Sequence, residues 1–181
     1  FCKSVKALNK DYVVIGEVWE DATNKFSHGG RRKYLLGEQL DSVMNYPMRE
    51  AIIAYVRHGD MWKFLRTANS LYYNYPREMT HQLLNLLGSH DTVRAITMLA
   101  GSGSEGLSSD MLAEKRMTAE EYKLGVKRLK LAYFILATIP GVPCIYYGDE
   151  IGMEGEKDPF NRRPYPWGRE NYELLRYFRK V

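Results

Sequence analysis

This sequence lacks the signatures of a disulfide-rich, metal-binding or membrane-spanning protein. Its 181 residues include two cysteines, Cys2 and Cys144, which are too few for a disulfide framework. No Cys-x-x-Cys or His-Glu-x-x-His segment occurs, so we expect no metal ion and no cofactor. No apolar run reaches the roughly 18 residues that a membrane-spanning helix needs, so we expect no membrane partner.

The chain has only a slight excess of positive charge. Basic residues number 26 and acidic residues 22, which gives a net charge of +4. The segments Arg31–Lys33 and Lys127–Lys130 are basic, but no recognised nucleic-acid motif accompanies them. The second segment falls in an amphipathic helical pattern, where charges typically form a solvated face. We therefore expect no nucleic-acid partner.

The composition is typical of a globular domain. The hydrophobic fraction is 45% and the charged fraction 27%, which suits a chain with a sizeable core. Aromatic residues make up 13%, and such side chains serve both core packing and sugar binding. The chain begins at Phe1 without a methionine and stops at Val181 within a helical pattern, so we expect it to be a piece of a longer protein.

Strand-like apolar runs alternate with helical patterns along the chain. The predicted strands span residues 13–18, 40–44, 83–88 and 143–148. The predicted helices span residues 48–56, 61–72, 120–139 and 171–181, after a helix tail at 1–10. This alternation predicts an α/β fold of four β/α units with a parallel sheet. The continuous apolar run at 13–18 predicts a strand buried on both faces, and the segment 21–37 a long polar loop.

Two carboxylates follow the ends of different predicted strands. Glu17 ends the first strand, and Asp91 follows the third in the segment Ser89-His90-Asp91. On a parallel barrel both would point into one pocket at the catalytic face. Paired carboxylates in such a pocket indicate general acid/base work, with glycoside hydrolysis as the leading case. The alternative is that each carboxylate only accepts hydrogen bonds from its own loop.

Four segments, in order, resemble the motifs of the α-amylase family (glycoside hydrolase family 13). Gly16-Glu17-Val18-Trp19 resembles the fifth-strand motif, and Leu86-Leu87-Gly88-Ser89-His90-Asp91-Thr92 the seventh-strand motif. The segment from Pro143 to Gly152 resembles the eighth strand. The segment from Asp41 to Tyr46 is similar to the sixth strand of the neopullulanase and cyclomaltodextrinase branch.

The resemblance implies a partial (β/α)8 TIM barrel. Residues 1–181 would be the C-terminal half of a catalytic barrel, comprising strands five to eight with their helices. Glu17 would be the general acid/base, and Asp91 would hold sugar hydroxyls and stabilise the transition state. The family's nucleophile is an aspartate in an Arg-x-Asp segment of strand four, and no such segment occurs in this chain. One implied partner is therefore the missing N-terminal half of the barrel.

The resemblance also implies the residues that bind an α-glucan oligosaccharide. His90 would hydrogen-bond sugar hydroxyls next to the cleaved bond, while a role in the core is its alternative. Trp19 and Glu20 would face the leaving group, although Trp19 can equally be packing. Tyr46 would shape specificity or pack. Asp158 and Arg162 would clamp the sugar, unless they form only a surface ion pair. The acidic segment Asp149–Asp158 lacks the spacing of a calcium loop, so no metal is expected there.

The expected function is that of a fragment of a retaining hydrolase for α-1,4 glucosidic bonds of starch-derived oligosaccharides, cyclodextrins or pullulan. Cleavage of α-1,6 bonds and glycosyl transfer stay open. The fragment alone is expected to be inactive, because it lacks the nucleophile. A non-catalytic carbohydrate-binding fragment and a half-barrel structural subunit are the rival interpretations. The subtype slightly favours a cytoplasmic location and leaves a homodimer of the longer protein open.

Overall fold

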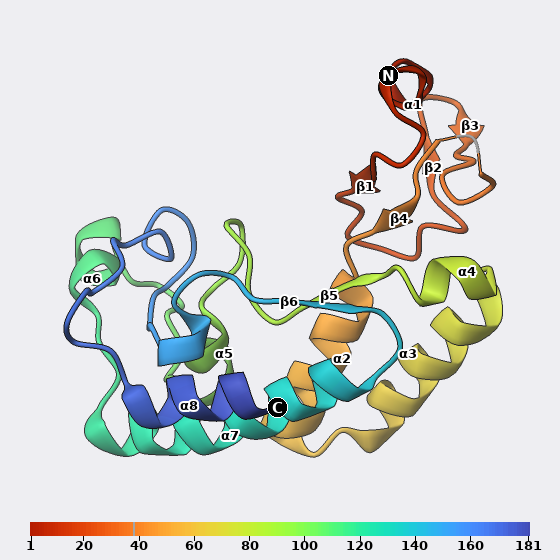
Figure 1. The fold of residues 1–181 in the computed structure, drawn as a ribbon. Coiled ribbons are helices and arrows are strands. Elements are labelled where there is room, and N and C mark those ends of the chain that lie inside the picture. Colours follow the sequence, from red (N-terminus) through yellow and green to blue (C-terminus); the bar gives the residue numbers. More distant parts are fainter. Residues whose placement is uncertain (38) are drawn as a thin grey trace.

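A computed structural model of the chain describes residues 1–37 and 39–181 and contains a strip of short parallel strands (Figure 1). Strand β1 (Ile15–Gly16) pairs in parallel with β4 (Ser42–Val43), and β5 (Leu84–Leu86) pairs in parallel with β6 (Val142–Cys144). A parallel bridge between Met44 and Leu84 joins the two pairs. The predicted parallel direction of these strands is thus confirmed, although each is shorter than its apolar run.

Helices fill the connections that follow β4, β5 and β6. Their bounds are α1 (Cys2–Leu8), α2 (Tyr46–His58), α3 (Met61–Asn74), α4 (Arg77–Thr80), α5 (Ala95–Ala100), α6 (Ser109–Glu114), α7 (Ala119–Thr138) and α8 (Tyr172–Lys180), with a 3-10 turn at Asp149–Ile151. The long predicted helices are confirmed as α2, α3, α7 and α8. The short helices α4, α5 and α6 were not predicted, because six residues or fewer show no clear helical period.

The described residues between β1 and β4 form no helix, so the prediction of four β/α units was wrong at this point. Between β1 and β4 the described residues form an antiparallel hairpin of β2 (Phe26–Ser27) and β3 (Gly30–Arg31). The turn places His28 and Gly29 at positive φ. Glycine adopts this conformation without steric cost, which lets the chain reverse here. The segment at 21–37 is therefore a loop that carries a hairpin.

The outer strands are exposed, which corrects the prediction that the run at 13–18 is a strand buried on both faces. Val13 and Ile15 are 67% and 40% exposed, and Val142 at the start of β6 is 48% exposed. Among the described residues, β1 pairs only with β4 and β6 only with β5, so each has one unpaired edge. Cys144 in β6 is partly buried. The apolar residues of these strands thus indicate surfaces that a further segment can cover.

The core lies where the helices pack beneath the strands (Figure 1). Helix α7 contacts α2, α5 and α8. The core residues Ala51, Leu99, Leu129 and Ala132 are fully buried among these helices. Helix α7 begins with a capping box, in which Thr118 and Glu121 satisfy each other's backbone N–H groups. The sequence pattern Thr-x-x-Glu therefore fixes where the main core helix starts.

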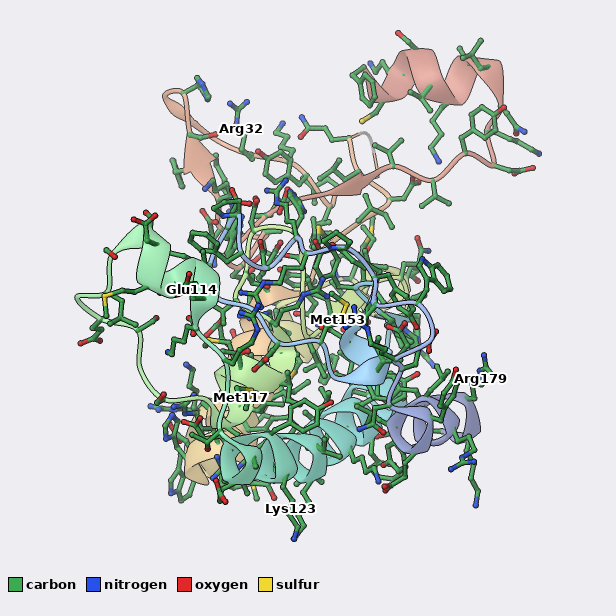
Figure 2. All side chains as sticks on the ribbon, turned by 90° about the vertical axis from the view of Figure 1, so that its left-hand side faces the viewer. Arg32, Glu114, Met117, Lys123, Met153 and Arg179 are labelled. Atoms are coloured by element: carbon green, nitrogen blue, oxygen red, sulfur yellow. The ribbon has the colours of Figure 1, made fainter. Side chains whose placement is uncertain are left out.

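Basic side chains project from the helical layer and from the hairpin (Figure 2). Lys123 on α7 and Arg179 on α8 point away from the body, and Arg32 lies next to the hairpin. The Arg32 guanidinium donates to Ser27 Oγ at 2.6 Å. Within residues 1–37 and 39–181, no helix is long and apolar enough to cross a lipid bilayer.

Candidate active site

Glu17 and Tyr46 meet where two neighbouring strands end. Glu17 directly follows β1, and Tyr46 is the first residue of α2, just beyond β4. The Tyr46 hydroxyl donates to Glu17 Oε1 at 2.8 Å. The same hydroxyl lies 3.0 Å from Ser89 Oγ, and this second contact comes from the loop after β5. Three strand ends therefore converge on one buried phenol.

Tyr46 is buried rather than open to a ligand, which modifies its predicted role as a sugar contact. Its exposed fraction is 1%, and the ring stacks on Trp19 with centroids 3.9 Å apart. Burial, together with the hydrogen bond to Glu17 and its negative charge, raises the pKa of the Tyr46 phenol to about 12. Tyr46 therefore stays protonated at neutral pH and can act on Glu17 as a hydrogen-bond donor.

Trp19 offers the exposed face of this aromatic pair. Its ring lies nearly parallel to that of Tyr46, with an angle of 13° between the planes. About half of the side chain is exposed to solvent. An exposed, rigidly supported indole is a flat amphipathic surface of the kind that suits a sugar ring. Trp19 is thus placed where it can both pack and bind, as the sequence left open.

The structure brings Glu17, His90 and Asp91 together. Each offers a potential ligand or proton-transfer atom, and these atoms all lie within 4.8 Å of one another. All three residues are exposed, so a substrate can reach them. His90 Nε2 lies 3.3 Å from Asp91 Oδ2. The cluster is the one group of three such residues among those that the structure describes.

Arg162 and Asp158 lie beside this cluster. Arg162 Nη2 donates to Asp91 Oδ1 at 3.1 Å, and Arg162 Nε lies 2.6 Å from Asp158 Oδ1. Arg162 Nε also donates to the His90 carbonyl at 3.1 Å. Arg162 therefore links the loop after β6 to the loop after β5, so it is more than one half of an isolated surface ion pair.

Glu20 lies outside the cluster. Its carboxylate forms an ion pair with Lys25, and that hydrogen bond lowers the pKa of Glu20. Both residues belong to the connection between β1 and the hairpin, and the pair is largely exposed. The structure therefore does not bring Glu20 together with Glu17, although the two are close in sequence.

The acidic side chains of the segment after β6 each face a different partner. Lys115 Nζ lies 2.9 Å from Glu156 Oε1, and Glu154 accepts from the backbone N–H of Met117 at 2.6 Å. Asp149 is buried, and its Oδ1 lies 3.5 Å from Arg94 Nη1. These carboxylates face different neighbours and do not converge.

Sequence reasoning missed the polar residues that hold the two loops together. Ser89, Arg94 and Asn161 are buried. Arg94 is packed against the rings of Tyr146 and Tyr147, with its Cζ 4.3 Å and 4.5 Å from their centroids. A buried arginine carries no local sequence signal, because its partners are distant in the chain. Ser89 was visible inside the quoted seventh-strand segment, but only the structure shows its contact with Tyr46.

Parallel strands with carboxylates at their carboxyl ends define a sheet-edge site of the kind found in α/β enzymes. Residues 1–174 match the family described as "Alpha amylase, catalytic domain". The chain belongs to the α-amylase family. This confirms the resemblance drawn from the four sequence segments.

The similar proteins carry hydrolase names. An amylopullulanase of Thermoanaerobacter thermohydrosulfuricus is 35% identical over the whole chain, which spans 12% of that protein. Neopullulanase 2 of Thermoactinomyces vulgaris is 33% identical, and the chain spans 26% of it. A solved structure of a cyclomaltodextrinase matches with a TM-score of 0.77 and 30% identity, covering 99% of this chain and 26% of the other. The chain thus spans about a quarter or less of the length of these relatives.

Proposed function

We propose that this chain supplies strands five to eight of the (β/α)8 barrel of a retaining α-glucan hydrolase. The observation that carries the proposal is the convergence of Glu17, His90 and Asp91 from two strand ends. In β/α barrels the catalytic residues come from the carboxyl ends of different strands. The exposed strand surfaces and the small share of its relatives that the chain spans support a second half barrel outside these residues.

In this proposal Glu17 moves the proton. Its carboxyl group donates a proton to the glycosidic oxygen while the bond from that oxygen to the anomeric carbon breaks. An aspartate outside this chain attacks the anomeric carbon and forms a glycosyl-enzyme ester. Glu17 then takes a proton from water, which hydrolyses the ester. General acid/base catalysis of this kind contributes about 10²–10⁴-fold.

Asp91 acts beside the sugar. Arg162 and His90 both contact its carboxylate, and they hold the negative charge close to Glu17. The charge-assisted hydrogen bond from Arg162 to Asp91 Oδ1 fixes the orientation of this carboxylate. The two carboxyl groups are within 4.8 Å, close to the spacing of about 5–5.5 Å that retaining pairs show. Reducing-sugar release by the isolated chain separates the stabilising role from a nucleophilic one.

The substrate class is an α-glucan oligosaccharide. The names of the similar proteins refer to maltodextrin rings and to pullulan. Trp19 offers a flat face next to Glu17, and His90 and Arg162 offer hydrogen-bond donors at the same rim. These groups fit glucose units joined by α-1,4 bonds, with α-1,6 bonds as a further candidate.

The proposal is tested by reducing-sugar release from maltoheptaose. The 181-residue chain should release none, while the longer protein that carries it should be active. Glu17→Gln in the longer protein should lower kcat about 10²–10⁴-fold and leave KM little changed, because the amide cannot donate the proton. The same variant of the isolated chain controls for contaminating amylase.

The other outcomes separate the rival interpretations. Release of sugar by the isolated chain that Glu17→Gln abolishes would make Asp91 the nucleophile and contradict the half-barrel assignment. Binding of maltoheptaose by the longer protein without turnover would favour a carbohydrate-binding fragment. A larger assembly of the isolated chain in solution, without sugar binding, would favour a structural subunit.

A further inference from the structure

Asn161 is fully buried behind the loop that carries His90 and Asp91. Its exposed fraction is 0%, and it belongs to the segment after β6. The Asn161 side-chain Nδ2 donates to the His90 carbonyl at 2.7 Å and to the Thr92 carbonyl at 2.8 Å. These two carbonyls flank Asp91 in the chain. One amide therefore clamps the backbone on both sides of the residue.

The backbone of Asn161 is itself held by a buried arginine, Arg94. Arg94 Nε donates to the Asn161 carbonyl at 2.7 Å, and the side chain of Arg94 is fully buried. The backbone N–H of Arg94 donates to the Gly155 carbonyl at 3.0 Å. A side chain at Gly155 would approach the Phe160 carbonyl to 2.6 Å, so only glycine lets the chain pass this closely. Asn161 thus sits on a rigid support rather than on a mobile loop.

The loop that Asn161 clamps has exposed functional groups. The side chains of His90 and Asp91 are 48% and 41% exposed, so packing alone does not fix their backbone. Asn161 Nδ2 carries two hydrogens, which match the two short contacts, and the Ser89 carbonyl is a third, longer one at 3.4 Å. Asn161 Oδ1 is buried with no hydrogen-bond partner among the described residues. The amide therefore directs both of its hydrogens at the loop that carries Asp91.

We propose that Asn161 is a positioning residue for Asp91. It acts through the backbone carbonyls of His90 and Thr92 and does not touch the substrate. The inference rests on the proposed function, because it needs Asp91 to act in the reaction. A displacement of about 1 Å from the productive geometry can cost about 10²-fold in rate.

Asn161→Asp tests the clamp with little change in volume, because a carboxylate oxygen cannot donate to the two carbonyls. In the longer protein this variant should lower kcat/KM for maltoheptaose about 10²-fold. The matched control is Asn85→Asp. Asn85 is also buried, but its amide donates to the Pro140 carbonyl, away from the site. The control should lose stability while its kcat/KM changes less than about threefold.

A double-mutant cycle with Asp91→Asn separates positioning from a general loss of structure. If Asn161 acts through Asp91, Asn161→Asp should change kcat/KM less than about threefold once Asp91→Asn is present. Multiplicative effects of the two substitutions, or full activity of Asn161→Asp alone, would overturn the inference. Asn161→Ser replaces Asn161→Asp if the aspartate variant does not fold. If neither folds while Asn85→Asp does, Asn161 is a folding residue and the inference fails.

The same measurements distinguish a failure of the proposed function. An inactive wild-type protein, or Glu17→Gln with wild-type kcat, would overturn the hydrolase assignment and the inference with it. An active wild-type protein that Glu17→Gln inactivates confirms the hydrolase. The result for Asn161 then decides the positioning role alone.

Discussion

The buried carboxyl group of Asp149 should make the stability of this chain depend on pH. Asp149 is 4% exposed, and burial raises the pKa of its carboxyl to about 7, although the charge of Arg94 lowers it. An aspartate in an unfolded chain has a pKa of about 3.9. Between about pH 4 and pH 7 the folded protein therefore holds a proton that the unfolded chain has released. Stability falls with rising pH over that range.

The magnitude follows from the pKa difference of about 3. Each unit of pKa corresponds to about 1.4 kcal/mol, so the contribution of Asp149 is about 4 kcal/mol. It is fully present below about pH 4 and is lost as pH rises through about 7. Asp149→Asn removes the titrating proton while keeping the shape of the side chain. The free energy of unfolding of wild type minus that of the variant should fall by about 4 kcal/mol from pH 4 to pH 8.

The assay is urea unfolding of the purified 181-residue chain at several pH values, followed by circular dichroism. Asp110→Asn, which removes an exposed carboxylate from α6, controls for the loss of one negative charge. The reasoning would be refuted if the difference in the free energy of unfolding, wild type minus Asp149→Asn, stayed constant or rose with pH. It would mean that Arg94, with its Nη1 3.5 Å away, keeps the carboxylate ionised throughout.

Three further substitutions follow from the contacts. Leu129→Ala creates a cavity at a residue of α7 that is 0% exposed, so it should lower the free energy of unfolding by about 2–5 kcal/mol. A urea midpoint equal to that of wild type would contradict the burial of Leu129 in the core. Thr118→Ala removes the capping box with Glu121 and should cost about 1 kcal/mol in the same assay, so a larger loss would point to other contacts. Tyr46→Phe keeps the ring stack but removes the hydrogen-bond donor to Glu17. In the longer protein, kcat/KM for maltoheptaose should therefore fall about tenfold. Unchanged kinetics would show that this hydrogen bond plays no part in the reaction.

The main helices and the parallel strands could be predicted because their signals are local. The apolar spacing of α7 and its Thr118 cap lie within one continuous segment, so the amino-acid sequence alone indicates both. The order of strand, helix and strand also restricts the sheet to a parallel arrangement. The hairpin at 26–31 could not be predicted in this way. Its strands are two residues long, so they carry no alternating pattern.

The exposure of the outer strands was not predictable either. An apolar run indicates that a segment favours burial, but it does not indicate which other segment will cover it. Val13 and Ile15 follow the pattern of a buried strand and are nevertheless exposed among the described residues. Similarly, Glu20 lies close to Glu17 in sequence, while its carboxylate pairs with Lys25. Local patterns indicate whether a residue favours burial or exposure, and its neighbours in the folded structure determine which it has.

The sequence by itself determined the chemical groups and the ends of the strands on which they stand. Glu17 and Asp91 were proposed because each lies at or just after the end of an apolar run, and His90 because its segment resembles a family motif. Only the tertiary structure decided which side chains meet. Tyr46 reaches Glu17 across 29 residues, and Asn161 reaches the His90 carbonyl across 71. The physical reason is that such contacts depend on how the intervening helices pack, and no local pattern encodes a partner that far along the chain.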